Sequence, residues 1–194
     1  TIIRGDRCLC KDLAFSVESG ELLLIEGPNG SGKTSLLRGI SGLLTLDTGE
    51  LTLNGVPVSQ IWQSFRGELI WLSHRVGIKA DLNLLENLGF EKNLRSTSNT
   101  ELTSILKRLG LDQIATLPFG LLSAGQGRRA GLARLLMGAG RIWILDEPLT
   151  NLDASGQSLV HELITEHLAS KGICIAASHG PLKVDATTHR IKLG

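Results

Sequence analysis

Leu22-Leu23-Leu24-Ile25-Glu26-Gly27-Pro28-Asn29-Gly30-Ser31-Gly32-Lys33-Thr34 is the stretch that decides the fold of this chain. It opens with a short, continuous apolar run, which is typical of a parallel strand buried on both faces. Residues 27–34 then match G-x-x-x-x-G-K-[ST], a turn whose backbone N–H groups surround phosphate oxygens and which opens a helix. The sequence therefore predicts an α/β protein with a nucleotide phosphate site at the end of this strand.

Each member of this loop has a predicted chemical role. The glycines at 27, 30 and 32 let the backbone approach the phosphates closely. Lys33 would neutralise the β and γ phosphates, the Thr34 hydroxyl would bind magnesium, and Ser35 would reach the α phosphate. A structural turn gives no reason for Lys-Thr at these offsets. The full set of predicted phosphate contacts is Gly27, Pro28, Asn29, Gly30, Ser31, Gly32, Lys33, Thr34 and Ser35.

A second apolar run, Ile142-Trp143-Ile144-Leu145, ends in the acids Asp146 and Glu147. Ligands of open α/β sheets lie at the carboxyl ends of the strands. We therefore expect Asp146 to hold magnesium beside Thr34, and Glu147 to polarise the attacking water. An acid pair at a strand end is by itself most often only solvated, and the phosphate loop is what favours the catalytic interpretation.

The remaining pattern predicts a mainly parallel sheet with helices on its faces. Expected strands cover residues 22–26, 69–73, 142–146 and 173–177, and expected helices cover 34–42, 84–94, 100–109, 123–137 and 154–170. Residues 50–53 followed by Asn54-Gly55 predict a small antiparallel hairpin. One domain, 1–194, is expected, with an inserted helical lobe over about residues 76–135.

Composition excludes several classes of protein. The net charge is +1 with both signs mixed along the 194 residues, so we expect no nucleic-acid partner. No stretch longer than about 15 residues lacks a charged side chain, so we expect no membrane-spanning segment; no signal peptide is visible either. Three scattered cysteines favour a reducing compartment.

Leu122-Ser123-Ala124-Gly125-Gln126 resembles the signature motif of ATP-binding cassette (ABC) ATPases, with Ala124 where the commonest version has glycine. Its chemistry can be read from the residues: Ser123 caps a helix whose free N–H groups, with the Gly125 amide, can bind anionic oxygen. Together with the order of the other motifs, this identifies the chain as a member of that family. The resemblance implies the P-loop NTPase fold of ABC ATPase type.

The resemblance also implies a division of labour between two copies. ATP, with Mg²⁺, would lie between two chains arranged head to tail, with Ser123 and Gly125 acting in trans and Lys33, Glu147 and His179 acting as catalytic residues in cis. His74 falls at the family's glutamine loop and Asp153 at its D-loop, so both are expected to contribute to nucleotide binding.

Two positions depart from the family pattern. His74 replaces the glutamine of the glutamine loop and can still donate or accept a hydrogen bond. The family stacks adenine on an aromatic side chain near the N-terminus, where this chain offers Ile3 or Arg4.

The segment from Leu72 to Leu88 is similar to the ATP-binding subunits of haem exporters that serve cytochrome c biogenesis. This similarity implies an integral membrane permease as partner, a peripheral location on the cytoplasmic face of the inner membrane, and a role in haem handling. Two alternatives stay open at this point: the ATPase subunit of another permease, for a lipid or metabolite, and a soluble ABC ATPase without a transport role.

Overall fold

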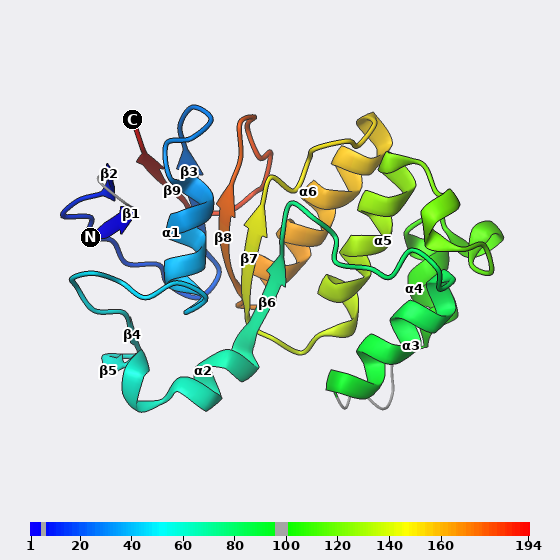
Figure 1. Ribbon diagram of the computed structural model, residues 1–194, viewed down its shortest axis with the longest axis horizontal. Coiled ribbons are helices and arrows are strands. Elements are labelled where there is room, and N and C mark those ends of the chain that lie inside the picture. Colours follow the sequence, from blue (N-terminus) through cyan, green and yellow to red (C-terminus); the bar gives the residue numbers. More distant parts are fainter. Residues whose placement is uncertain (5–6, 96–100) are drawn as a thin grey trace.

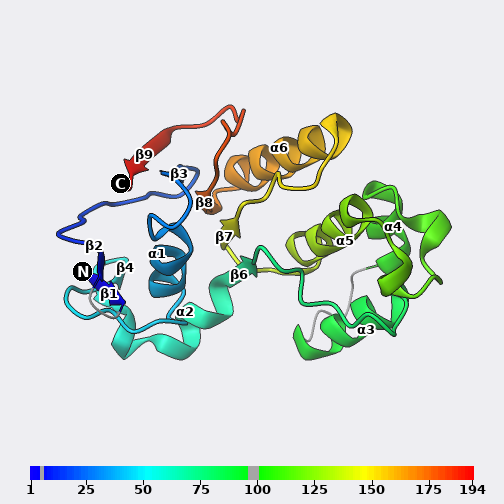
Figure 2. The ribbon, with the colours of Figure 1, turned by 45° about the horizontal axis from the view of Figure 1, so that its top comes forward.

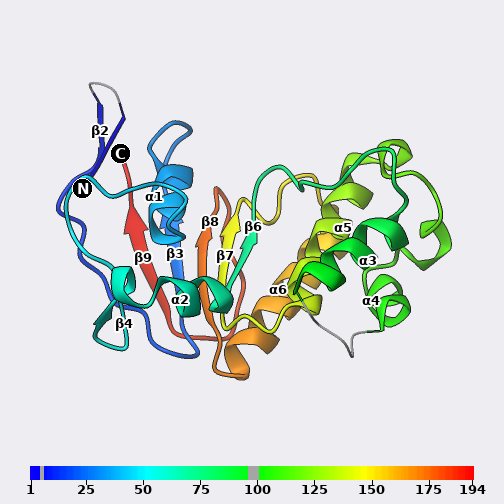
Figure 3. The same cartoon turned by 60° about the horizontal axis from the view of Figure 1, so that its bottom comes forward.

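A computed structural model describes residues 1–4, 7–95 and 101–194 of the chain (Figure 1). Its centre is a five-stranded sheet in the order β6-β7-β8-β3-β9, and every pairing in it is parallel. The strands are β3 (Leu22–Glu26), β6 (Leu69–Leu72), β7 (Ile142–Asp146), β8 (Ile173–Ala177) and β9 (Thr188–Lys192). The arrows in Figure 3 point the same way, so all carboxyl ends meet at one edge. The four strands expected from the sequence are confirmed.

Helices cover both faces of the sheet because its central strands are apolar on both sides. In β3, Leu22 and Leu24 pack into one buried cluster and Leu23 and Ile25 into the other. Helix α1 (Lys33–Ile40) lies on one face and α6 (Ala154–Ala169) on the opposite face (Figure 2). Burial of each such side chain contributes roughly 1.5–3 kcal/mol. The loops at the edge of the sheet are therefore anchored to a well-packed hydrophobic core.

The small antiparallel portion is confirmed. Strand β4 (Thr52–Leu53) pairs with β5 (Val56–Pro57). Both turn residues, Asn54 and Gly55, have positive φ angles of 52° and 77°, as a tight hairpin turn requires. A second antiparallel pair, β1 (Ile2–Arg4) with β2 (Arg7–Cys10), was not expected, nor was helix α2 (Trp62–Glu68).

Strand β9 was also missed. Its sequence, Thr-His-Arg-Ile-Lys, is polar because it forms an edge of the sheet, with three of its five residues exposed. Charged edge strands avoid pairing with other chains, and they lack the apolar run by which buried strands are found.

Helices α3 (Leu84–Arg95), α4 (Leu102–Arg108) and α5 (Ala124–Met137) pack together at one end of the molecule (Figures 1 and 3). Their apolar side chains continue the buried cluster on the α6 face of the sheet. Helix α4 ends at Arg108, and Gly110 follows two residues later with a φ of 67°, the left-handed conformation that stops a helix. Residue 100, where this helix was expected to begin, lies outside the described residues. The boundaries of a helical lobe at about 76–135 stay a prediction.

Short 3₁₀ turns at Val58–Gln60, Asp112–Ile114 and Phe119–Leu121 complete the structure. Among the helices of the described residues, none combines the length and the apolar character that crossing a bilayer needs.

Candidate active site

A cavity of about 380 Å³ opens at the carboxyl edge of the sheet, where the sequence predicts the phosphate site. The loop between β3 and α1 forms one side, and residues at or just after the carboxyl ends of β6, β7 and β8 form the rest. Its lining residues are Asn29, Gly30, Lys33, Thr34, His74, Asp146, Glu147, Thr150 and His179. The parallel topology thus brings together residues that are up to 150 positions apart in the chain.

The glycine-rich loop has the backbone conformation that its glycines permit. Gly30 and Gly32 have φ angles of 81° and 100°, and Gly32 is the N-cap of α1. A Cβ atom at Gly27 would lie 2.4 Å from the Leu193 carbonyl oxygen. Lys33 is 7% exposed, and its Nζ donates hydrogen bonds to the carbonyl oxygens of Gly27 (2.8 Å) and Pro28 (3.1 Å). These bonds hold the ammonium group across the mouth of the loop.

Thr34 and Asp146 meet as the sequence predicts. The Thr34 hydroxyl lies 3.0 and 3.2 Å from the two carboxylate oxygens of Asp146, which is 2% exposed. Magnesium prefers hard oxygen ligands and is commonly held by one or two protein groups together with phosphates and water. A buried carboxylate beside a hydroxyl at a phosphate loop fits that ion. Within the described residues there is no cluster of three or more His, Cys, Asp or Glu side chains that could hold a metal alone.

Glu147 lies at the centre of a network of charged and polar groups. Its Oε1 is 3.9 Å from Lys33 Nζ and 3.3 Å from His179 Nε2, and its Oε2 accepts a hydrogen bond of 3.2 Å from the His179 backbone amide. His179 Nε2 also lies 2.7 Å from Asn29 Oδ1. The Glu147 backbone has a φ of 51°, an uncommon conformation for a residue with a side chain. The geometry suits a carboxylate that orients a water molecule beside a histidine.

Two further lining residues follow the ends of their strands. His74, after β6, is exposed and lines the cavity, as the resemblance implies. Thr150 also lines it and was missed by the sequence analysis. The sequence feature that could have identified Thr150 is its position three residues after Glu147, on the turn between β7 and α6.

The remaining predicted residues lie elsewhere. Ser123, Gly125 and Asp153 are described, but they are not among the residues that line the cavity. Ser123 caps α5, as predicted: its hydroxyl accepts from the Gln126 amide (3.2 Å), and its own amide donates to the Gln126 side chain (2.9 Å). Ser123 itself remains exposed.

Asp153 has clear partners within the chain. It caps α6 through the Gly156 amide (2.8 Å) and pairs with Arg129 Nη2 (2.7 Å). The Arg129 hydrogen bond, followed by the Gly156 amide, holds the pKa of Asp153 below its ordinary value. Its carboxylate therefore serves a structural purpose here, and a nucleotide contact stays a prediction. Gly125 is close to the same turn, because a Cβ there would lie 3.0 Å from the Asn151 carbonyl oxygen. The side chains of Ile3 and Arg4 lie outside the described residues.

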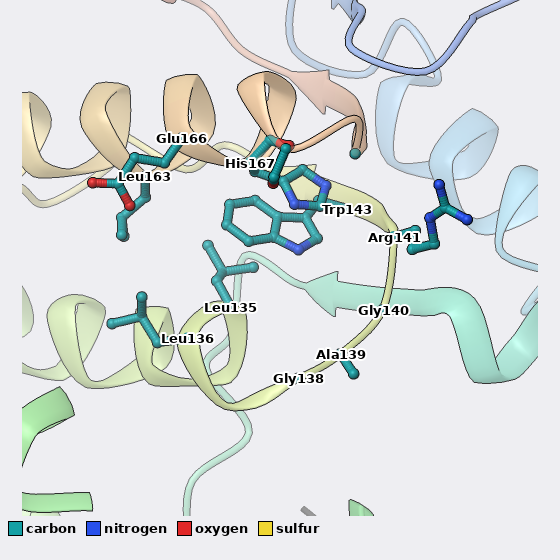
Figure 4. Close-up of a pocket in the computed structure, with 12 residues that line it drawn as sticks. Leu135, Leu136, Gly138, Ala139, Gly140, Arg141, Trp143, Leu163, Glu166 and His167 are labelled. Atoms are coloured by element: carbon teal, nitrogen blue, oxygen red, sulfur yellow. The ribbon is translucent and has the colours of Figure 1, made fainter. Parts of the chain in front are cut away.

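A second cavity, of about 450 Å³, lies at the opposite edge of the sheet (Figure 4). It is formed by the last turns of α5 and α6 and by the segment that enters β7. Trp143 stacks on His167 with ring centroids 3.9 Å apart. Because none of the predicted site residues lines it, the first cavity is the candidate active site.

Sequence comparison gives the chain its relatives. The family profile described as "ABC transporter" matches residues 10–150. Proteins named "Cytochrome c biogenesis ATP-binding export protein CcmA" are similar over nearly their whole length. The protein from Vibrio parahaemolyticus is 40% identical, with 100% of this chain and 96% of that protein covered. The one from Pseudomonas aeruginosa is 39% identical, with coverage of 99% and 95%.

Solved structures agree with the fold. A putative ABC transporter ATP-binding protein from Pyrococcus furiosus superposes with a TM-score of 0.80 at 27% identity, covering 96% of this chain and 92% of its own. A dimeric ATP-binding cassette with bound ADP and phosphate gives 0.79 at 20% identity, with coverage of 92% and 84%. With the phosphate loop and the two strand-end acids in place, the chain belongs to the ABC transporter family and is an ABC-type ATPase.

Proposed function

We propose that this ATPase works as a head-to-tail dimer on a membrane permease and couples hydrolysis of MgATP to haem export for cytochrome c maturation. The observation that carries the cargo assignment is the 38–40% identity, over almost the full chain, to proteins named for export in cytochrome c biogenesis. The chain would lie on the cytoplasmic face of the inner membrane through its permease.

The geometry supports a division of roles within one copy. The loop from Gly27 to Thr34 binds the phosphates, and Lys33 neutralises their charge. Thr34 and Asp146 would hold Mg²⁺, which would neutralise negative charge that develops on the phosphates during hydrolysis. Glu147 orients the attacking water. His179 holds the Glu147 carboxylate in place and lies beside the γ phosphate.

A second copy is needed to complete the site. Ser123 and Gly125, at the start of α5, are not among the residues that line the cavity of their own chain. The exposed N-terminus of α5 would instead meet the nucleotide of a partner, where its free amides favour anionic oxygen. Removal of one such donor typically costs about 100- to 1,000-fold in rate.

A complementation experiment tests this proposal. The chain, with or without Lys33→Ala, is expressed in a bacterium that lacks its own cytochrome c biogenesis ATPase, and covalently bound haem in c-type cytochromes is measured. Wild type should restore the signal, and it should co-purify with a multi-span membrane protein. Lys33→Ala should still bind the permease but should not restore the haem signal. An active ATPase that restores no haem attachment and co-purifies with an unrelated permease would overturn the cargo assignment.

A further inference from the structure

Arg128, in the second turn of α5, is a buried cation that the sequence analysis missed. It is 3% exposed, and its guanidinium group lies between the carboxyl ends of β6 and β7. Nη1 donates to the carbonyl oxygens of Ser73 (2.7 Å) and His74 (3.4 Å). Nη2 donates to those of Asp146 (3.0 Å) and Glu147 (2.7 Å).

Only arginine can make this set of contacts. Its two terminal nitrogens carry four hydrogens in one plane, and here each nitrogen donates to two backbone carbonyl oxygens. Nε is buried without a hydrogen-bond partner among the described residues. Burial lowers the pKa of Arg128, while the nearby carboxylates of Asp146 and Glu147 act in the opposite direction. An arginine stays charged at neutral pH, so a desolvated cation is held beside the two acids of the site.

The backbone at Glu147 depends on such support. A residue with a side chain is strained in the left-handed region and stays there only where its surroundings fix it. Three hydrogen bonds hold the Glu147 peptide groups: its amide donates to the Ala177 carbonyl (2.9 Å), and its carbonyl accepts from Arg128 (2.7 Å) and from the Thr150 amide (3.3 Å). This conformation turns the Glu147 side chain toward Lys33 and His179.

We propose that Arg128 is a positioning residue of the ATPase site. By holding the carbonyl groups of Asp146 and Glu147 it fixes the directions of both carboxylates. By holding Ser73 and His74 it ties the same helix to the segment that brings His74 to the cavity. The inference rests on the proposed roles of Asp146 and Glu147 in hydrolysis. It adds a buried residue that does not line the cavity.

The contact also joins two parts of the site that act on different nucleotides. Helix α5 begins at Ser123 and Gly125, which are proposed to meet the nucleotide of a partner chain, and Arg128 lies little more than one turn further on. Arg128 therefore connects the first turns of α5 to the backbone of Glu147 in its own site.

Arg134 provides a matched control on the same helix. Its Nη1 and Nη2 donate to the carbonyl oxygens of Val76 (2.7 Å) and Gly77 (3.1 Å), and its Nε pairs with Glu91 (3.2 Å). It thus anchors the segment after β6, as Arg128 does, but within the described residues no hydrogen bond or ion pair joins it to the strand-end acids. Comparison of the two arginines separates loop anchoring from carboxylate positioning.

The experiment compares wild type, Arg128→Met, Arg128→Lys and Arg134→Met as full chains. Three quantities are measured: kcat for ATP with saturating Mg²⁺, the Kd for ATP with Mg²⁺ chelated, and amide hydrogen exchange of residues 142–150 without nucleotide. Arg128→Met should lower kcat by about 10- to 100-fold, the usual effect of a misplacement near 1 Å. Its metal-free Kd should stay at the wild-type value, because the phosphate loop is intact, and residues 142–150 should exchange faster. Arg128→Lys should give a kcat and an exchange rate between those of wild type and Arg128→Met. Arg134→Met should keep the wild-type kcat and the wild-type exchange of residues 142–150.

Three results would overturn the inference: wild-type kcat and exchange in both Arg128 variants, an equal loss of kcat in Arg134→Met, or loss of metal-free ATP binding in step with kcat. If Arg128→Met does not fold, Arg128→Lys decides by the same criteria. A wild-type chain that hydrolyses no ATP would count against the proposed function instead, and the exchange comparison in nucleotide-free protein would still test the contact.

Discussion

Replacement of Glu147 by glutamine should separate ATP binding from ATP hydrolysis. Glutamine has the same shape, so its side-chain oxygen can still accept from the His179 amide, now at 3.2 Å from Oε2. What is lost is the negative charge that lies 3.9 Å from Lys33 Nζ and that would orient and deprotonate water. Loss of general-base assistance typically costs about 100- to 10,000-fold in rate, or roughly 2.7–5.5 kcal/mol of activation free energy.

The assay measures phosphate release at saturating MgATP, the Kd for ATP, and the mass of the complex by size-exclusion chromatography with light scattering. Glu147→Gln should bind ATP as wild type does and should accumulate as a dimer, because the sandwiched nucleotide is not consumed. Glu166→Gln is the matched control, since that carboxylate lies on α6 in an exposed pair with Arg108 (2.6 Å). Surface pairs contribute only about 0–1 kcal/mol, so the control should keep wild-type turnover. A Glu147→Gln protein with wild-type kcat would remove Glu147 from the mechanism.

Three further predictions concern the metal, the packing and the pH response. Thr34→Val keeps the shape of the side chain but loses its hydroxyl; the Mg²⁺ concentration for half-maximal hydrolysis should rise by about 10-fold or more, with metal-free ATP affinity unchanged. Gly42→Ala should lower the free energy of unfolding by about 1–3 kcal/mol, because Gly42 has a φ of 70° and the new Cβ would lie 2.0 Å from the Trp62 ring. Gly67→Ala is the control: no atom lies within 4 Å of its new Cβ, so it should not destabilise the protein in the same urea titration. Burial lowers the pKa of His167 from its ordinary 6.5, so the folded protein binds fewer protons than the unfolded chain. The stability that this group contributes is complete above pH 6.5 and is lost as the pH falls through the lowered pKa. The free energy of unfolding, measured at pH 7, 6 and 5, should therefore fall less steeply with decreasing pH in His167→Gln than in wild type. An unchanged pH dependence would contradict the assignment.

Much of the fold followed from the apolar runs. Strands β3, β7 and β8 are buried on both faces and are therefore continuous in sequence, so their positions could be predicted to the residue. Strand β9 and the β1–β2 pair could not, because edge and short antiparallel strands depend on which strand they meet and carry polar residues. Their pairing is a property of the sheet and not of the segment.

The candidate site divides in the same way. The order of residues along the chain was enough to predict the chemistry: a phosphate loop with Lys33 and Thr34, two acids at the end of a buried strand, and a histidine after another. Their types and offsets are local and are set by what phosphate, metal and water require. Tertiary structure alone decided the distances between them, since Thr34 meets Asp146 across 112 positions of the chain and His179 meets Asn29 across 150.

The role of Arg128 depends entirely on how the chain folds. In sequence it is one of two adjacent arginines on a helix, with nothing to separate it from Arg129. In the folded chain Arg129 pairs with Asp153 on the surface, while Arg128 is buried against four carbonyl oxygens at the ends of β6 and β7. The physical reason is that backbone acceptors have no sequence signature, so the partners of a buried cation appear only when the strands that carry them are brought together.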